Sequence, residues 1–222
     1  MYKGILLDID NTLYSYEPLH QLAQKTLINY INSKHGIELN VISNAYKQAK
    51  LQVKQNNPAS ASSHNRLLYA QNLCELLSIN AFKNSISFYD IYWNTFLENL
   101  SLSFGARKLL SDYGHLPICL VTDLTAHIQH RKVEKLELDN WADSMVTSEE
   151  AGCEKPHPFM FQLGLAKLNL RANEVCMIGD NFKKDIEGAT RLGINSFWLT
   201  DPANYIEHDN ISCISDLGEI KW

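Results

Sequence analysis

Five short apolar runs, each five to seven residues long, recur along the chain and constrain its fold more than any other feature. They are almost continuously apolar instead of alternating, which is typical of strands covered on both faces of a parallel sheet. The runs cover residues 2–8, 117–123, 144–148, 175–180 and 194–200. Helical patterns separate the later runs, at residues 125–138, 158–168 and 182–192. This alternation predicts an α/β fold with a doubly wound, mostly parallel sheet.

The first gap between these runs is different from the others. It spans about a hundred residues, far more than one crossover helix requires. Four helical patterns lie in it, at residues 19–34, 41–55, 64–77 and 86–99, with a loop composition at 56–63. We therefore expect a helical domain of residues 15–99 inserted into a sheet domain made of residues 1–14 and 100–222.

The composition limits which binding partners and which cellular location we expect for this chain. The net charge of -5 argues against a broad nucleic-acid surface, and no apolar stretch is long enough to span a bilayer. The apolar run at the N-terminus is too short for a signal peptide and ends in acids. The five cysteines include no C-x-x-C pair, which disfavours a disulfide framework or a zinc ribbon. We expect a cytoplasmic protein with no nucleic-acid or membrane partner, in which Cys119 and Cys176 are buried as small apolar groups.

Polar residues gather where the predicted strands end, which is where ligands bind in open parallel sheets. The first run ends in Asp8, and Asp10 lies two positions further on, so on an extended backbone their side chains point to the same side. Two carboxylates this close repel each other and require a cation or a proton. Mg²⁺ suits such a site because it prefers oxygen ligands and keeps waters for a substrate phosphate.

Later strand ends supply the complementary groups. Asp180 ends the fourth run and would complete the coordination shell of the cation. Lys155, just before a predicted helix, offers a positive charge to phosphoryl oxygens, and Thr122 offers a hydroxyl donor. Phosphoryl transfer asks a protein mainly for positioning and charge neutralisation, and these groups provide both.

Four motifs in order make the chain similar to a known family. They are D-x-D-x-T at residues 8–12, the strand-end Thr122, Lys155 before a proline, and G-D-x-x-x-x-D at residues 179–185. Together they resemble the haloacid dehalogenase superfamily, and the helical insertion resembles the cap of its C1 group. The resemblance implies a Rossmann-like core, an inserted cap domain and a magnesium-dependent phosphatase.

The resemblance also implies roles for individual residues. Asp8 would be the nucleophile that forms an aspartyl-phosphate, and Asp10 the general acid and then the general base. Asp8 and Asp180 would bind Mg²⁺ through carboxylates, and Asp10 through its backbone carbonyl. Thr122 and Lys155 would hold the phosphoryl group.

Other residues would support or contact these groups. Asp185, with Asn181 beside it, would order metal-bound waters or hold Lys155. The candidates for substrate contact are Asn11, Asp123, Tyr16 and Arg66. The chain departs from the family at Asp123-Leu124, where many relatives have Asn-Gly. We expect Asp123 to cap the helix that starts at residue 125 or 126.

The implied substrate is a small phosphorylated metabolite, namely a sugar, sugar-acid or nucleotide phosphate. A phosphomutase or other phosphotransferase with the same intermediate is the main alternative. Asp10 argues against a dehalogenase, whose relatives have no second acid in this motif. A phosphonatase would need an imine-forming cap lysine, and a non-enzymatic phosphate sensor would not need Asp10 or Lys155.

Overall fold

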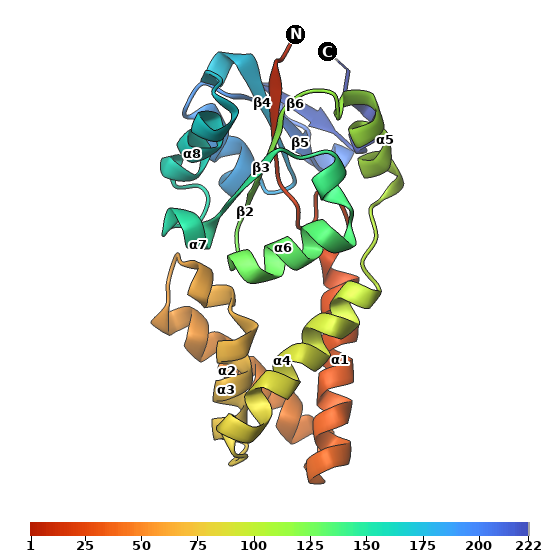
Figure 1. Ribbon diagram of the computed structural model, residues 1–222, viewed down its shortest axis with the longest axis vertical. Coiled ribbons are helices and arrows are strands. Elements are labelled where there is room, and N and C mark those ends of the chain that lie inside the picture. The colour runs from red at the N-terminus through yellow and green to blue at the C-terminus, as the bar shows by residue number, and fades with distance from the viewer. Residues whose placement is uncertain (222) are drawn as a thin grey trace. The chain divides into compact units, whose positions relative to one another are not determined.

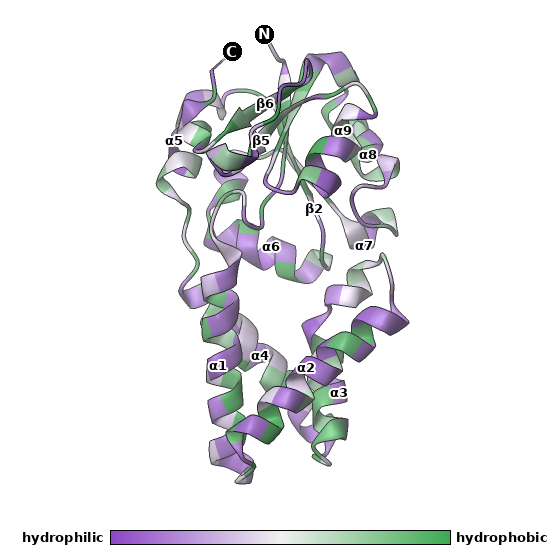
Figure 2. Cartoon of the chain, turned by 180° about the vertical axis from the view of Figure 1, so that it is seen from behind, coloured by the Kyte–Doolittle hydropathy of each residue, from purple (hydrophilic) through white to green (hydrophobic). Residues whose placement is uncertain are grey.

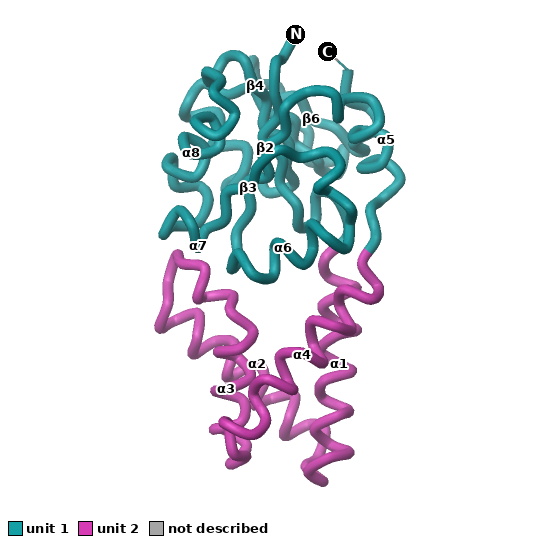
Figure 3. Tube along the Cα trace, viewed as in Figure 1, with its two compact units in different colours: residues 1–15, 101–222 teal, residues 16–100 magenta. Residues whose placement is uncertain are grey.

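The computed structural model describes residues 1–221, which form two compact units (Figure 3). The sheet unit comprises residues 1–15 and the chain from residue 101 onward. The helical unit is Tyr16–Leu100.

A parallel six-stranded sheet forms the centre of the sheet unit. Its strands are β1 (Gly4–Leu7), β2 (Ile118–Thr122), β3 (Ser144–Thr147), β4 (Val175–Gly179), β5 (Asn195–Leu199) and β6 (Ile211–Ile214). They lie in the order β3-β2-β1-β4-β5-β6, and every neighbouring pair is parallel. The predicted doubly wound α/β fold is confirmed. The sequence did not predict β6, an edge strand of four residues in which only the two isoleucines are buried.

The register of the central strands brings three polar strand ends together. Every residue of β1, β2 and β4 is buried, as their continuous apolar sequences predict. Leu7 at the end of β1 pairs with Leu120 of β2 and with Ile178 of β4. The residues that follow these strands therefore emerge side by side, at the point where the chain order of the sheet reverses (Figure 1).

Helices cover both faces of this sheet. They are α5 (Phe104–Tyr113), α6 (Ala126–Lys135), α7 (Ser148–Ala151), α8 (Pro158–Leu168) and α9 (Gly188–Thr190), with a π-helical segment, η4, at Phe182–Glu187. Figures 1 and 2 show α5 and α8 on opposite sides of the sheet. Short 3-10 turns lie at η2 (Leu138–Asn140), η3 (Ala172–Glu174), η5 (Pro202–Asn204) and η6 (Leu217–Glu219). The segment predicted as helical over 182–192 is helical from Phe182 to Thr190, in the π form through η4 and in the α form through α9.

Close packing of α8 against the strands shapes the core of the sheet unit. Met160 and Phe161 are fully buried in a cluster with Leu6 and Val121. A Cβ at Gly164 would lie 3.0 Å from a methyl group of Leu6, so the absence of a side chain there lets the helix approach β1 closely. The strands are predominantly green in Figure 2, whereas the helices carry green and purple on different faces.

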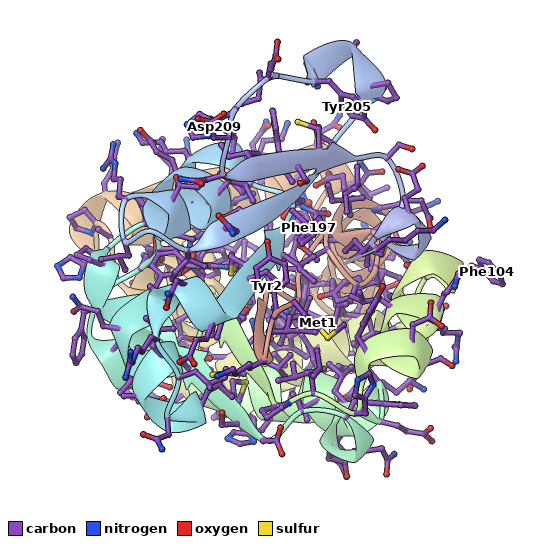
Figure 4. All side chains as sticks on the ribbon, turned by 90° about the horizontal axis from the view of Figure 1, so that it is seen from above. Met1, Tyr2, Phe104, Phe197, Tyr205 and Asp209 are labelled. Carbon is purple, nitrogen blue, oxygen red and sulfur yellow. The ribbon has the colours of Figure 1, made fainter. Side chains whose placement is uncertain are left out.

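Side chains near the amino terminus also pack on the sheet. The Tyr2 ring contacts Phe197 of β5 edge to face, with the centroids 6.2 Å apart (Figure 4). Cys119 and Cys176 are buried, as expected, and all five cysteines are free thiols. Within residues 1–221, no helix combines the length and the apolar character that a membrane span requires.

The helical unit contains α1 (Tyr16–His35), α2 (Leu39–Asn56), the 3-10 turn η1 (Ala61–His64), α3 (Arg66–Leu76) and α4 (Ala81–Glu98). Side-chain caps set two of the helix starts. The Asn65 side chain accepts a hydrogen bond from Leu67 N at 2.9 Å, and Asn80 accepts one from Lys83 N at 3.1 Å. The second cap starts α4 earlier than the predicted residue 86. Its buried stripe then packs against α1 and α3, and comprises Phe88, Tyr92, Trp93 and Phe96.

We expect His20 to make the stability of the helical unit depend on pH. Its imidazole is buried on α1, 2.6 Å from the Tyr92 hydroxyl. Burial, and then the positive charge of Arg66, lower its pKa to about 4. Between the unfolded value of about 6.5 and the folded value, only the unfolded chain binds the proton, so stability falls as pH drops through this window.

Urea unfolding at pH 7 and pH 5 measures this effect. The loss of unfolding free energy on acidification is predicted to be smaller in His20→Asn than in the wild type. His208→Asn, which changes an exposed histidine, is the control and keeps the wild-type pH dependence. Identical pH dependence in all three proteins would contradict the assignment.

Candidate active site

A polar hollow of about 120 Å³ lies in the sheet unit, at the carboxyl ends of β1, β2 and β4. Its lining residues are Asp8, Asp10, Asn11, Thr122, Asp123, Lys155, Asp180, Asn181, Lys184 and Asp185. All of them except Lys184 are candidates from the sequence. The parallel register is the reason that segments distant in the chain meet here.

Two side chains bind the carboxylate of Asp8 in this hollow. Its carboxylate is buried, and its Oδ1 accepts a hydrogen bond from Lys155 Nζ at 2.6 Å. Its Oδ2 accepts a bond from the Thr12 hydroxyl at 2.8 Å. The threonine of the D-x-D-x-T motif thus orients the first aspartate of the same motif.

Lys155 bridges two carboxylates. Its Nζ lies 2.6 Å from Asp8 Oδ1 and 2.6 Å from Asp185 Oδ1, and it donates to the carbonyl of Val121 at 2.9 Å. Burial alone would lower the pKa of this ammonium, but the charges of Asp185 and Asp8 outweigh burial and raise it. The side chain is therefore a fixed positive charge.

Three carboxylates surround this single ammonium. One oxygen each from Asp8, Asp180 and Asp185 lies within 4.8 Å of the others. Burial, reinforced by the charges of Asp185 and Asp180, raises the pKa of Asp8 well above its usual range, although Lys155 opposes the shift. Burial and the neighbouring Asp185 raise the pKa of Asp180 to about 6. Excess negative charge on hard oxygen donors is the composition that a divalent cation such as Mg²⁺ requires, so these residues fit one.

The turn after β4 fixes the third carboxylate. The backbone N–H of Asn181 donates to Asp185 Oδ2 at 3.0 Å, and the Asn181 side chain accepts from Lys184 N at 3.0 Å. A Cβ at Gly179 would lie 2.6 Å from atoms of the Asp185 side chain. The glycine of the G-D-x-x-x-x-D motif therefore makes room for the aspartate that ends it.

Asp10 has a separate set of partners, on α6. Lys132 Nζ donates to both of its carboxylate oxygens, at 2.6 and 2.8 Å, and Gln129 Nε2 donates to Oδ2 at 3.1 Å. The Tyr14 hydroxyl also donates to Asp10. Burial would raise the pKa of Asp10, but the charge and hydrogen bonds of Lys132 outweigh burial and lower it. Asp10 is therefore an anion at neutral pH in this arrangement.

Gln129 links Asp10 to the end of β2. Its amide nitrogen lies 2.7 Å from Thr122 Oγ1 and 2.7 Å from the backbone carbonyl of Asp123. The sequence analysis missed both Gln129 and Lys132. A signal for Lys132 was present, because it occupies the buried stripe of α6 between Ile128 and Leu136, at spacing i, i+4 and i+8.

Asp123 does not cap α6, so that prediction is wrong. Its carboxylate accepts from the backbone N–H of Lys155 at 3.0 Å and from Lys184 Nζ at 2.7 Å. The first N–H of α6, from Ala126, donates instead to Glu149 at 2.7 Å. The Lys184 ammonium of η4 gives Asp123 a charge-assisted hydrogen bond, which is stronger than a neutral cap. Leu124, in the position of the family's glycine, has a φ of 86°, an uncommon conformation for a residue with a side chain.

The remaining candidates are Asn11, which lines the same hollow, and two residues of the helical unit. Asn11 lies on the rim of the hollow, exposed, with a φ of 66° that asparagine tolerates well. Tyr16 and Arg66 belong to the helical unit, where the Arg66 guanidinium donates to the Tyr16 hydroxyl.

Comparisons with known proteins agree with this arrangement of motifs. A family model described as haloacid dehalogenase-like hydrolase matches residues 2–193. A ribulose-1,5-bisphosphate 5-phosphatase from Halopiger xanaduensis is 34% identical over 207 residues, which are 91% of this chain and 86% of the relative. A glyceraldehyde 3-phosphate phosphatase from Pyrococcus abyssi is 29% identical over 202 residues, which are 90% of this chain and 82% of the relative.

Solved structures share the fold across nearly the whole chain. A 2-haloacid dehalogenase from Pseudomonas syringae pv. Tomato matches with a TM-score of 0.78 at 17% identity, covering 99% of this chain and 96% of that one. A HAD phosphatase from Thermococcus onnurineus matches with a TM-score of 0.72 at 21% identity, covering 98% and 95%. At these identities the likeness speaks for the fold alone.

We predict that Lys132→Met raises the pKa of Asp10, because the change removes the buried cation that stabilises its carboxylate. Carboxyl ¹³C NMR of aspartate-labelled protein, titrated from pH 3 to pH 8, measures the shift. Lys135→Met, on the same helix but away from Asp10, is the control. An unchanged Asp10 titration in Lys132→Met would show that the ion pair does not set the protonation of this residue.

Proposed function

Because the chain belongs to the haloacid dehalogenase-like hydrolases, we propose that it is a magnesium-dependent phosphatase of small sugar phosphates that acts through an aspartyl-phosphate on Asp8. The observation that carries the proposal is the position of Asp8. Its carboxylate lies between the Lys155 ammonium and the Thr12 hydroxyl, in a hollow that opens at the ends of the central strands. The names of the curated relatives support hydrolysis of a phosphate monoester.

The acidic cluster would hold the metal. Asp8 and Asp180 are the carboxylate ligands in this proposal, the backbone carbonyl of Asp10 is a third ligand, and Asp185 orients Lys155 beside them. When bound, Mg²⁺ supplies positive charge that keeps Asp8 ionised and offsets the charge of the phosphoryl oxygens.

In the first chemical step, a carboxylate oxygen of Asp8 attacks phosphorus. The bond between phosphorus and the ester oxygen breaks, and its electron pair stays on the leaving alcohol. Lys155 and the Thr122 hydroxyl hold the phosphoryl oxygens during the transfer, and Lys155 keeps its proton because two carboxylates stabilise the charged form. The product is an acyl phosphate on Asp8.

Asp10 moves the protons of both steps. A bound phosphate dianion near Asp10 raises the pKa of its carboxyl, which allows it to carry the proton that it gives to the leaving oxygen. The resulting carboxylate, stabilised by Lys132, then accepts a proton from the water that attacks the phosphorus and releases Asp8. The ion pair with Lys132 thus favours the base form that the second step uses.

The substrate class follows from the relatives together with the site. Ribulose 1,5-bisphosphate and glyceraldehyde 3-phosphate are the substrates named for the relatives described above. Both are phosphate esters of small sugars, and the hollow around Asp8 in the sheet unit has a volume of about 120 Å³. We therefore place the substrate among short sugar phosphates and not among larger phosphorylated polymers.

We predict that Asp8→Asn lowers phosphate release from ribulose 1,5-bisphosphate and from glyceraldehyde 3-phosphate by roughly 10⁴-fold or more, the order expected when a covalent nucleophile is removed. Asp209→Asn, an exposed acid outside the hollow, is the matched control and keeps the wild-type rate. Circular dichroism checks that both variants are folded. Near-wild-type turnover by Asp8→Asn would rule out Asp8 as the nucleophile.

The same assay separates hydrolysis from phosphotransfer. A phosphatase releases one inorganic phosphate for each ester cleaved and requires no acceptor other than water. If release depends on an added sugar phosphate, and phosphate is recovered on that sugar, the enzyme is a phosphotransferase instead.

We also predict that chelation by EDTA stops turnover and that added Mg²⁺ restores it. Asp180→Asn should raise the Mg²⁺ concentration for half-maximal rate by at least about tenfold, because even groups outside a metal's ligand set commonly contribute 10–100-fold to affinity. Full activity in the chelated protein, or an unchanged Mg²⁺ requirement in Asp180→Asn, would contradict the metal assignment.

A further inference from the structure

The helical unit contains a buried cation that no carboxylate neutralises. Arg66, at the start of α3, is only 7% exposed. Its Nη1 donates to the backbone carbonyl of His64 at 2.6 Å, and its Nη2 donates to the Tyr16 hydroxyl. Among residues 1–221, no aspartate or glutamate lies within ion-pair distance of it, and its Nε is buried without a hydrogen-bond partner. Buried charges are normally paired, so this guanidinium requires a reason.

Aromatic rings surround the guanidinium but leave donors unused. Its central carbon lies 4.9 Å from the ring centre of Tyr69, 5.4 Å from Tyr92 and 5.7 Å from Trp93. Cation–π contacts stabilise part of the charge, but they leave the buried Nε without a hydrogen-bond acceptor among the described residues. The hydroxyl of Tyr46, on α2, is likewise buried without a hydrogen-bond partner among the described residues. The Arg66 Nε and the Tyr46 hydroxyl are thus two buried hydrogen-bond donors of the helical unit that have no partner among the described residues.

A second cation lies on the same face as Tyr46. Lys50 follows it by one helical turn on α2 and is only partly exposed. Burial, and then the positive charges of Arg66 and Lys54, lower the pKa of Lys50. His20 is kept neutral for the same two reasons, burial and Arg66. Glu17 is the acid whose charge acts on both His20 and Lys50, and it forms no ion pair with Arg66.

We propose that the helical unit contains an anion-binding site, in which Arg66, the Lys50 ammonium and the Tyr46 hydroxyl bind a phosphate or carboxylate group of a small ligand. Arg66 presents a planar fork of donors that matches the oxygens of such groups, and the aromatic rings fix the fork in place. An anion would remove the repulsion between the two cations and would occupy donors that are otherwise unused. The site stands on residues of the helical unit alone, and the choice of a sugar phosphate as its ligand rests on the proposed function.

Calorimetric titration of the full-length, EDTA-treated protein with inorganic phosphate tests the site. Without a metal, the sheet unit's cluster of Asp8, Asp180 and Asp185 around one lysine disfavours anions, so binding there does not obscure the result. We expect the wild type to bind phosphate and Arg66→Met to bind at least tenfold more weakly, with Arg66→Lys between them. Lys47→Met, on the exposed face of α2, is the matched control and binds as the wild type does.

Two milder variants keep the test decisive if Arg66→Met does not fold. Tyr46→Phe removes only a hydroxyl, and Lys50→Met removes a partly exposed charge. Each is expected to weaken phosphate binding. Unchanged affinity in Arg66→Met, or in both milder variants, overturns the proposal, as does a wild-type protein that binds no phosphate.

A second arm identifies the source of the anion. If ribulose 1,5-bisphosphate binds the EDTA-treated wild type and binds Lys50→Met at least tenfold more weakly, the site takes the phosphate of a sugar ester. If inorganic phosphate binds there and ribulose 1,5-bisphosphate does not, the site takes a free anion. Phosphate binding by the metal-free protein requires no turnover. Failure of this site therefore leaves Asp8-dependent hydrolysis intact, and failure of hydrolysis leaves the titration result intact.

Discussion

One ammonium group among three carboxylates is the interaction on which the rest of the sheet unit depends. Lys155 Nζ lies 2.6 Å from both Asp8 and Asp185, and Asp180 completes the cluster. Burial, and then the excess of negative charge, raise the pKa values of Asp8 and Asp180, and one positive charge among three carboxylates favours the binding of a divalent cation. The parallel register of β1, β2 and β4, and the glycine that makes room for Asp185, serve to bring these groups together.

The two aspartates of the first motif are only two positions apart, yet their environments push their pKa values in opposite directions. Burial among like charges raises that of Asp8, whereas Lys132 lowers that of Asp10. Opposite shifts in neighbouring acids are a common way for one site to assign different roles to identical groups. In the proposed mechanism, Asp8 depends on a metal to be a nucleophile, and Asp10 depends on Lys132 to be a base. The helical unit contains another unbalanced group, the buried Arg66, whose Nε has no hydrogen-bond partner among the described residues.

The sequence predicted the fold and the family correctly, because continuous apolar runs and four ordered motifs are local signals. It also named nearly all residues of the hollow, since strand ends are readable from the same runs. Lys132 was missed because its partner Asp10 is 122 positions away and lysines on helices are usually exposed. Asp123 was misjudged for a similar reason: a cap is a local rule, but Lys184, 61 positions away, binds the carboxylate instead. The short edge strand β6 carries too few buried residues to be recognised without its neighbour.

The central claim is that phosphorus becomes bonded to a carboxylate oxygen of Asp8 during turnover. The most direct measurement is acid quenching of the magnesium-loaded enzyme within milliseconds of mixing with ribulose 1,5-bisphosphate, followed by peptide mapping with mass spectrometry. The mechanism predicts one phosphoryl group on the peptide that contains Asp8, attached to that residue and absent when magnesium is withheld. Rapid phosphate release with a phosphoryl group on no aspartate, or on a different residue, would contradict it.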